Sequence, residues 1–169
     1  MTSTAAKPPI TIRQATEADI PFVFNSWLKS YRTSQFASPI DNTIFFSEHH
    51  KVIERILRYY DVRIACSPED PDQIHGFICA GYTDGIFTLH YIYVKHPFRR
   101  LGVAKELYDN FPKPENAASL YTHQTRASLP IAPKYNLIFH PYLAYDPAAY
   151  NGDKPYETFQ SLKPKKETK

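Results

Sequence analysis

From Tyr91 to Ala104 the chain reads YIYVKHPFRRLGVA, and this stretch decides the fold because it joins the end of a strand, a basic turn and the start of a helix. At a helix start several backbone N–H groups have no partner, and the helix dipole is positive there. Arg99 and Arg100 add two guanidinium groups at the same point. The stretch therefore predicts an anion-binding turn, in which a pyrophosphate would fit.

The spacing of this turn, Arg99-x-x-Gly102-x-Ala104, has a physical reason at each fixed position. Gly102 leaves room for a phosphate beside the backbone, and the small Ala104 lets the new helix lie close to a ligand. The following residues favour a helix to about Phe111, and Pro112 ends it. An ordinary strand-turn-helix corner with solvated arginines is the alternative.

The residues around this turn predict a sheet. Residues 62–66, 74–82 and 86–94 are rich in β-branched and aromatic side chains and are separated by turn signals, which predicts an antiparallel meander of three strands. Residues 119–123 are a candidate strand after the helix, so we expect a parallel crossover. Residues 136–145 are a further candidate strand.

Two amphipathic helices precede the meander. Apolar residues recur at spacings of three and four over 20–31, after a cap at Thr16, and over 52–60, where Ser47 is the candidate cap. The connection 32–46 is long enough to suggest a functional loop, and its aromatic residues could line a pocket. The order of elements predicts an α/β fold with a mixed, mostly antiparallel central sheet and flanking helices.

Length and composition favour one compact domain. The chain has 169 residues, of which 43% are hydrophobic and 15% aromatic. We expect a single domain over residues 1–146 and an irregular extension over 147–169. The net charge of +3 is modest, and the lysines near the C-terminus contribute to it.

Cysteine usage and hydropathy bear on the compartment. Cys66 and Cys79 are isolated and lack a metal-ligand spacing, so we expect reduced thiols in an intracellular protein. The sequence shows neither a signal-peptide pattern nor a run of about 18 apolar residues, which a membrane span would need. We therefore expect a cytoplasmic protein without a membrane partner.

The segment 94–104 resembles the acetyl-coenzyme A signature of the GCN5-related N-acetyltransferases (GNAT), which is Arg/Gln-x-x-Gly-x-Gly/Ala after a strand often ending in Val-x-Pro. Here one extra residue precedes Pro97. Residues 10–20 are similar to the family's first strand and helix start, and the resemblance covers roughly residues 10–111. It implies the GNAT fold and transfer of an acetyl group from acetyl-CoA to an amine, on a small molecule or a protein.

The resemblance also implies roles for individual residues. The thioester would lie along the end of the strand and the phosphates in the turn, so the implied cofactor-binding residues are Ile92, Tyr93, Val94, Arg99, Arg100, Leu101, Gly102, Val103 and Ala104. In the family the base often comes from the central strand, and the proton donor is often a late tyrosine. His90 stands where relatives frequently have a carboxylate, and an unperturbed imidazole pKa of about 6.5 suits a base.

Alternatives to these catalytic roles stay open. The base could be His90, Tyr91 or a water relay, and His90 could equally be a hydrogen-bonded strand histidine. Since strand neighbours point to opposite faces, either His90 or Tyr91 can face the acceptor, but not both. Tyr135 is the candidate proton donor, with Tyr142 and Tyr145 as substitutes. The two prolines of residues 129–134 would disrupt the helix that relatives have there, and a packing or surface role also fits Tyr135.

The sequence is also compatible with other functions and sites. A binding protein that keeps the fold but lacks catalysis is one alternative, and a nucleic-acid modifier using Arg32 and nearby basic residues (Lys29, Arg55, Arg58) is another. His49 and His50 diverge by about 100° on a helix, so we expect a surface pair and no metal site. His123 and His140 could approach each other without a third ligand. A homodimer, common in the family, stays open.

Overall fold

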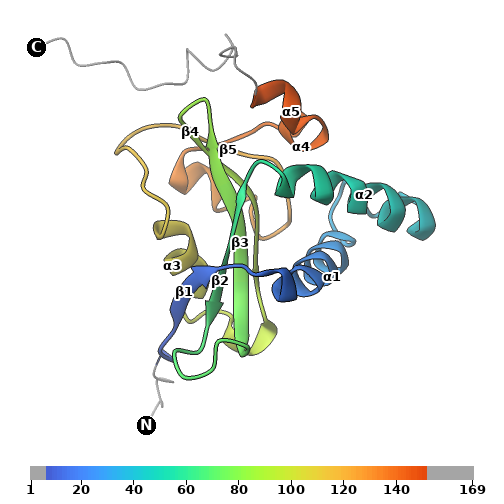
Figure 1. The fold of residues 1–169 in the computed structure, drawn as a ribbon. Helices are drawn as coiled ribbons and strands as arrows, with labels where there is room; N and C mark the ends of the chain where they lie inside the picture. Colours follow the sequence, from blue (N-terminus) through green and yellow to red (C-terminus); the bar gives the residue numbers. More distant parts are fainter. Residues whose placement is uncertain (1–6, 152–169) are drawn as a thin grey trace, which may run out of the picture.

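The computed structural model describes residues 7–151 and contains one six-stranded sheet in the order β1-β2-β3-β4-β5-β6 (Figure 1). The pairs from β1 to β4 are antiparallel, whereas β5 is parallel to β4 and β6 is parallel to β5. The mixed, mostly antiparallel sheet is thus confirmed. The strands are β1 (Thr11–Gln14), β2 (Asp61–Cys66), β3 (Ile74–Thr83), β4 (Ile86–Val94), β5 (Ser119–Tyr121) and β6 (Leu137–Phe139).

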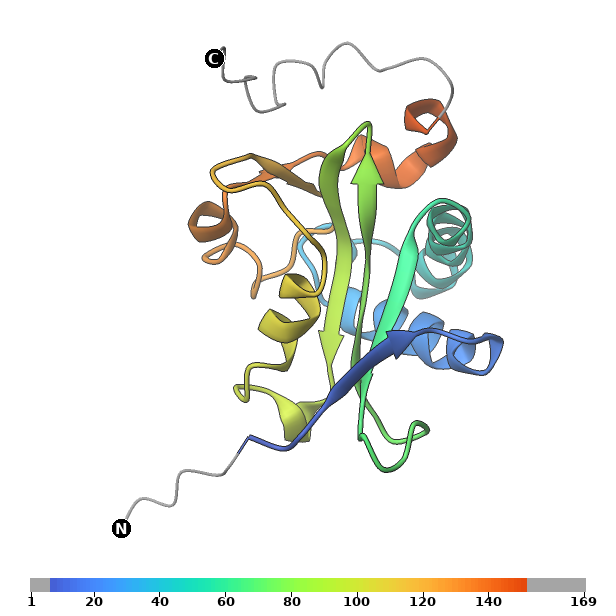
Figure 2. The ribbon, with the colours of Figure 1, turned by 60° about the vertical axis from the view of Figure 1, so that its left-hand side comes forward.

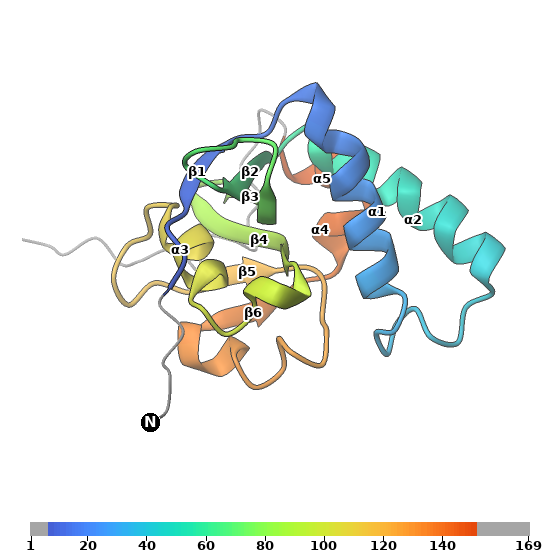
Figure 3. The same ribbon diagram turned by 90° about the horizontal axis from the view of Figure 1, so that it is seen from below.

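Helices cover both faces of the sheet. In Figure 2, α1 and α2 lie on one side of the long strands β3 and β4, and α3 lies on the other. Figure 3 shows the same arrangement from below, with β4, β5 and β6 following one another across the sheet. The helices are α1 (Ile20–Tyr31), α2 (Asn42–Leu57), α3 (Val103–Asp109), α4 (Tyr142–Tyr145) and α5 (Pro147–Tyr150), and short 3-10 helices are η1 (Glu17–Asp19), η2 (His96–Phe98) and η3 (Ala132–Tyr135).

Each face of the sheet has its own core. The stripe of α1, which includes the fully buried Trp27, packs with Ile53 of α2 against Phe77 of β3. On the opposite face Leu107 of α3 packs against a cluster that contains Phe87 of β4. Apolar side chains on alternate residues of β3 and β4 therefore enter two different cores.

The second helix begins earlier than predicted. The carboxylate of Asp41 accepts hydrogen bonds from the backbone N–H groups of Thr43 (2.9 Å) and Ile44 (3.3 Å), so it caps α2 at Asn42, and Ser47 lies inside the helix. The connection is shortened to residues 32–41. Arg32 holds this loop by donating to Asn42 Oδ1 (2.6 Å) and to the Ile40 carbonyl (2.7 Å). Its guanidinium is thus engaged in the fold, which weakens the nucleic-acid alternative.

The chain after β5 also differs from the prediction. The expected strand over 136–145 is reduced to β6, because Pro141 cannot donate to a ladder and instead precedes the first residue of α4. Residues 147–150, predicted to be irregular, form α5, in which Pro147 is buried. Residues 152–169 of the predicted extension lie outside the described residues, and the division at 146 stays a prediction.

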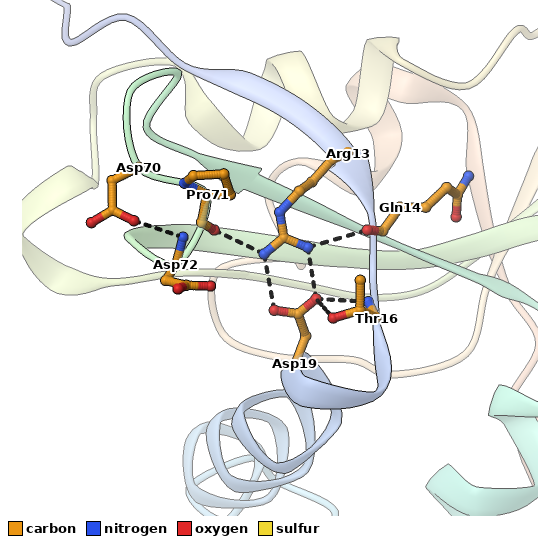
Figure 4. Close-up of polar contacts among 7 residues, drawn as sticks. All are labelled: Arg13, Gln14, Thr16, Asp19, Asp70, Pro71 and Asp72. Carbon is orange, nitrogen blue, oxygen red and sulfur yellow. Dashed lines mark hydrogen bonds and ion pairs between the residues drawn. The ribbon is translucent and has the colours of Figure 1, made fainter.

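Arg13 of β1 and Asp19 tie the first strand to the first helix (Figure 4). The guanidinium donates to both carboxylate oxygens, at 2.7 Å and 2.9 Å, and to the Pro71 carbonyl at 2.9 Å. The Thr16 backbone N–H also donates to Asp19, at 2.7 Å, as expected of the predicted cap. The hydrogen bonds from Arg13 are the largest cause of the lowering of the Asp19 pKa to about 2.

We expect Asp19→Asn to lower the free energy of unfolding by about 2 kcal/mol at pH 7, since the carboxylate is 5% exposed and its pKa is about 2 when folded. The stabilisation by a carboxyl of lowered pKa is complete above its ordinary value near 4 and disappears as the pH falls toward 2. Urea unfolding at pH 7 and pH 3 should therefore show a smaller difference between wild type and variant at pH 3. Glu17→Gln, an exposed neighbour, is the control, and an equal loss in it would contradict the assignment.

Two further expectations concern the compartment. Cys66 and Cys79 are buried free thiols, as predicted. No helix within residues 7–151 has the length and hydrophobicity that a membrane span requires.

Candidate active site

A cleft opens where β4 and β5 separate. The two strands pair only through Thr88 with Leu120 and Leu89 with Tyr121, and the Thr122 N–H then donates to the Leu89 carbonyl at 3.1 Å. Within residues 7–151, no strand pairs with this edge of β4 beyond that point. The cleft has a volume of about 540 Å³ and lies between β4, α3 and residues 121–137.

A β-bulge in β4 sets the side chains at the inner end of the cleft. Tyr91 pairs with Cys79 and Leu89 with Ala80, so His90 is an extra residue without a partner of its own. The bulge turns both His90 and Tyr91 toward the face that α1 and α2 cover: the His90 ring lies 4.1 Å from the Tyr60 ring, and Tyr91 stacks on Trp27 of α1 at 4.9 Å. The prediction that these two neighbours must point to opposite faces was therefore wrong.

The free edge of β4 offers backbone hydrogen-bonding groups to the cleft. The Lys95 N–H donates to the His75 carbonyl (2.8 Å), on the β3 side. Because amides alternate between the two edges of a strand, those of Val94 and Ile92 face the other edge. Both residues line the cleft. A backbone donor at this edge can stabilise negative charge on a bound carbonyl oxygen.

The predicted basic turn adopts left-handed backbone conformations. Arg100 has φ 64° and Gly102 has φ 80°, and α3 begins at Val103 directly after Gly102. Gly102 is exposed, and it lines the cleft. A side chain at this φ would be strained, so the glycine has a conformational reason as well as the predicted spatial one.

Most of the implied cofactor-binding residues come together. Two of them, Tyr93 and Leu101, do not line the cleft. The Tyr93 side chain faces the α1 side of the sheet. The Arg99 guanidinium is drawn back toward β4, since its Nε donates to the Val94 carbonyl at 2.8 Å. The implied residues that do line the cleft are Ile92, Val94, Arg99, Arg100, Gly102, Val103 and Ala104.

Tyr135 lies at the end of η3 and also lines the cleft. Its ring is 40% exposed and packs edge to face on Tyr108 of α3, with centroids 5.2 Å apart. The prolines limit this segment to a short 3-10 helix, as expected. Tyr142 and Tyr145, the substitutes for Tyr135, lie outside the cleft lining.

A chain of hydrogen bonds joins three buried histidines beside the cleft. His49 Nε2 and His123 Nε2 are 2.9 Å apart, His123 Nδ1 lies 2.9 Å from the Thr122 hydroxyl, and that hydroxyl lies 2.8 Å from His90 Nδ1. His49 is only 4% exposed, so the prediction of a surface pair with His50 was wrong. His123 meets His49 rather than His140 across the fold. Within residues 7–151, no three His, Cys, Asp or Glu side chains form a group that could hold a metal ion.

The Thr122 hydroxyl gives this chain a direction. It has one proton and therefore donates to only one of the two Nδ1 atoms that it contacts. If Thr122 donates to Nδ1 of His90, the single ring proton of neutral His90 is on Nε2, which has no hydrogen-bond partner within residues 7–151. The His90 ring packs edge to face against the Tyr60 ring. His123 then donates from Nδ1 to Thr122, and His49 donates from Nε2 to His123. In this arrangement each of the three hydrogen bonds has one donor and one acceptor.

The same burial keeps these imidazoles neutral. Loss of hydration lowers the pKa of His49 to about 4 and that of His90 to about 3. The pKa of His123 is also lowered well below its usual range, by burial and by its two histidine neighbours. The ordinary pKa assumed for His90 is thus wrong, and a neutral His90 is a weak proton acceptor at neutral pH.

No protein-family model matches the chain, and no curated protein matches it. Solved structures do match. One is described as a possible acetyltransferase from Clostridium difficile 630, with 15% identity and a TM-score of 0.49 over 87% of this chain and 94% of the other. Another is an acetyltransferase of the GNAT family from Staphylococcus aureus Mu50, with 16% identity and a TM-score of 0.42 over 94% and 93%.

A third match is the PaiA N-acetyltransferase from Thermoplasma acidophilum in complex with coenzyme A, with 15% identity and a TM-score of 0.43 over 60% of this chain and 69% of the other. At sequence identities of 15% and 16%, these three matches concern the fold alone. The solved structures to which this chain is similar thus include acetyltransferases of the GNAT family, the family that its basic turn resembles in sequence.

Proposed function

We propose that the chain binds acetyl-coenzyme A in the cleft between β4 and β5 and transfers the acetyl group to an amine. The observation that carries this proposal is the continuity of three features: the free edge of β4, the left-handed turn at Arg100 and Gly102, and the start of α3. A thioester arm and a pyrophosphate need these features side by side. The strand, the turn and the helix follow one another in the same order as in the GNAT signature that residues 94–104 resemble.

The cleft has the chemistry that coenzyme A requires. Its walls are largely apolar, with Ile92, Val103 and Leu137 among the lining residues, which suits an extended pantetheine arm. Basic side chains of Arg100, Lys105 and Lys134 also belong to the lining. The exposed Gly102 leaves the turn amides accessible to phosphate oxygens. These residues would hold the phosphates.

Acetyl transfer is a simple exchange of bonds. Acetyl-coenzyme A supplies the thioester: a C–N bond to the acceptor forms, the C–S bond breaks, the amine loses a proton and the thiolate gains one. In our proposal the Ile92 N–H stabilises the oxygen that becomes negative. Tyr135 is the proposed proton donor to the sulfur, because it is exposed within the cleft lining.

The role of the base is assigned differently from the initial expectation. His90 Nδ1 is occupied by Thr122, its ring packs against that of Tyr60, and its lowered pKa disfavours proton uptake. We propose that His90 positions the bulge and that water accepts the proton from the amine. The Tyr91 hydroxyl contacts Ser30 Oγ at 2.7 Å, and burial raises its pKa to about 12, so it stays protonated and acts at most as a hydrogen-bond donor.

Calorimetric titration with acetyl-coenzyme A and with free coenzyme A tests the proposal directly. We expect micromolar binding of both and release of free thiol when an amine panel is added. Binding without thiol release across the panel would favour the alternative, a binding protein that has lost catalysis. Absence of binding by either ligand would refute the proposal.

A further inference from the structure

A second groove lies on the other face of β4, between α1 and the segment that follows the strand. Its volume is about 540 Å³. In the part of the chain that the structure describes, four basic residues line it and no acidic side chain does: Lys29 comes from α1, and Lys95, His96 and Arg99 come from the turn after β4. Within residues 7–151, none of these four takes part in an ion pair.

Two of these cations are held in place over aromatic rings. The Lys95 ammonium lies 5.1 Å from the centroid of the Phe22 ring, and the Arg99 guanidinium lies 5.8 Å from that of Tyr93. Arg99 is fixed further by its bond to the Val94 carbonyl. Positive charges that are positioned, yet not neutralised, create a local potential that attracts an anion.

Two side chains of the groove lie next to the cleft. Arg99 lines both the groove and the cleft. Ser30 lines the groove and contacts the hydroxyl of Tyr91, which belongs to the bulge and to the cleft lining. A molecule in the groove would therefore lie next to the inner end of the cleft, across β4.

We propose that this groove binds the acceptor substrate and that the acceptor carries an anionic group, a carboxylate or a phosphate, besides its amine. The inference rests on the proposed function, because only an acetyl donor in the cleft makes the groove an acceptor site. The charges of Lys29, Lys95 and Arg99 disfavour a polyamine, since a second ammonium group would be repelled there. An anion bound at Lys29 and Lys95 leaves the amine free to approach Tyr91.

Matched amines test this inference without requiring turnover. The protein is first saturated with coenzyme A, and the pairs O-phosphoethanolamine with ethanolamine and β-alanine with propylamine are then titrated by calorimetry. We expect at least about tenfold tighter binding of the anionic member of one pair, and a preference that weakens as salt is added. The pair that shows the preference identifies phosphate or carboxylate. Equal or weaker binding of both anionic members would overturn the inference.

Substitution of the two groove lysines tests whether the anionic group binds in the groove. Lys29→Gln and Lys95→Gln should each reduce the preference by about fivefold and leave coenzyme A affinity unchanged. Lys51→Gln is the control, because Lys51 is an exposed lysine of α2 that pairs with Glu48. If the groove variants weaken coenzyme A binding and leave the preference intact, the cations belong to the cofactor site and the inference fails. Binding of coenzyme A to the wild type is measured in a separate titration, and its absence would refute the proposed function.

Discussion

We expect Gly102→Glu to abolish binding of coenzyme A, with at least a hundredfold loss of affinity, while the protein stays folded. Gly102 lies in the lining of the cleft directly before α3, so the new carboxylate would occupy the place proposed for the phosphates and repel them. Its φ of 80° also makes any side chain strained, which costs about 1–2 kcal/mol of stability. The measurement is calorimetric titration with coenzyme A, together with urea unfolding.

Gly85→Glu is a matched control for this variant. Gly85 has the same φ of 80°, and a Cβ there would meet no atom within 4 Å, so the substitution introduces the same strain and charge away from the cleft. Only Gly102→Glu should lose binding. If both variants bind coenzyme A as the wild type does, the phosphates are not held at this turn. If both lose binding in proportion to stability, the effect is one of folding.

Local sequence patterns predicted the elements that depend on local interactions. The stripe of α1, the three strands of the meander and the start of α3 all appear where spacing, turn residues and the glycine placed them. The start of α2 was missed because Asp41, an equally good cap, lies six residues before Ser47 and satisfies two backbone amides.

The bulge could not be predicted from β4 alone. It arises from a shift in register against β3 between Cys79 and Ala80, so it depends on how two strands pair. That shift moves the His90 and Tyr91 side chains to the same face. Side chains alternate between the two faces of the sheet on either side of the bulge, but not at the bulge itself.

The histidine chain was missed for a related reason. His49 and His123 are 74 residues apart in sequence, and neither has a local pattern that announces the contact. A surface pair of His49 and His50 was predicted in place of a metal site, because neighbours on a helix diverge by about 100°. His49 instead lies on the face of α2 that packs against Tyr31 and Phe45. The sequence did offer one signal: His49 lies three residues before Val52, and so on the same face of the helix as the apolar stripe that begins there.

We expect Thr122→Val to lower the free energy of unfolding by about 2–4 kcal/mol at pH 7. Valine has nearly the shape of threonine but leaves the Nδ1 atoms of His90 and His123 without a partner in a buried site, at about 1–3 kcal/mol each. Urea unfolding measures the loss. Because His90 and His123, the two partners of the lost hydroxyl, both line the cleft, we expect the affinity for coenzyme A to fall as well, by less than in Gly102→Glu.

Two variants separate the hydroxyl of Thr122 from other effects of the substitution. Thr122→Ser keeps the oxygen between the two imidazoles and should recover most of the lost stability, whereas Thr33→Val, at an exposed threonine, should change it by less than about 0.5 kcal/mol. A valine variant as stable as the wild type would mean that the hydroxyl does not bridge the histidines. A serine variant as unstable as the valine one would mean that the methyl group, which only serine lacks, contributes as much to stability as the hydroxyl. Rescue by serine alone supports a hydroxyl that bridges the two imidazoles, and with it the view that His90 positions the bulge instead of accepting a proton.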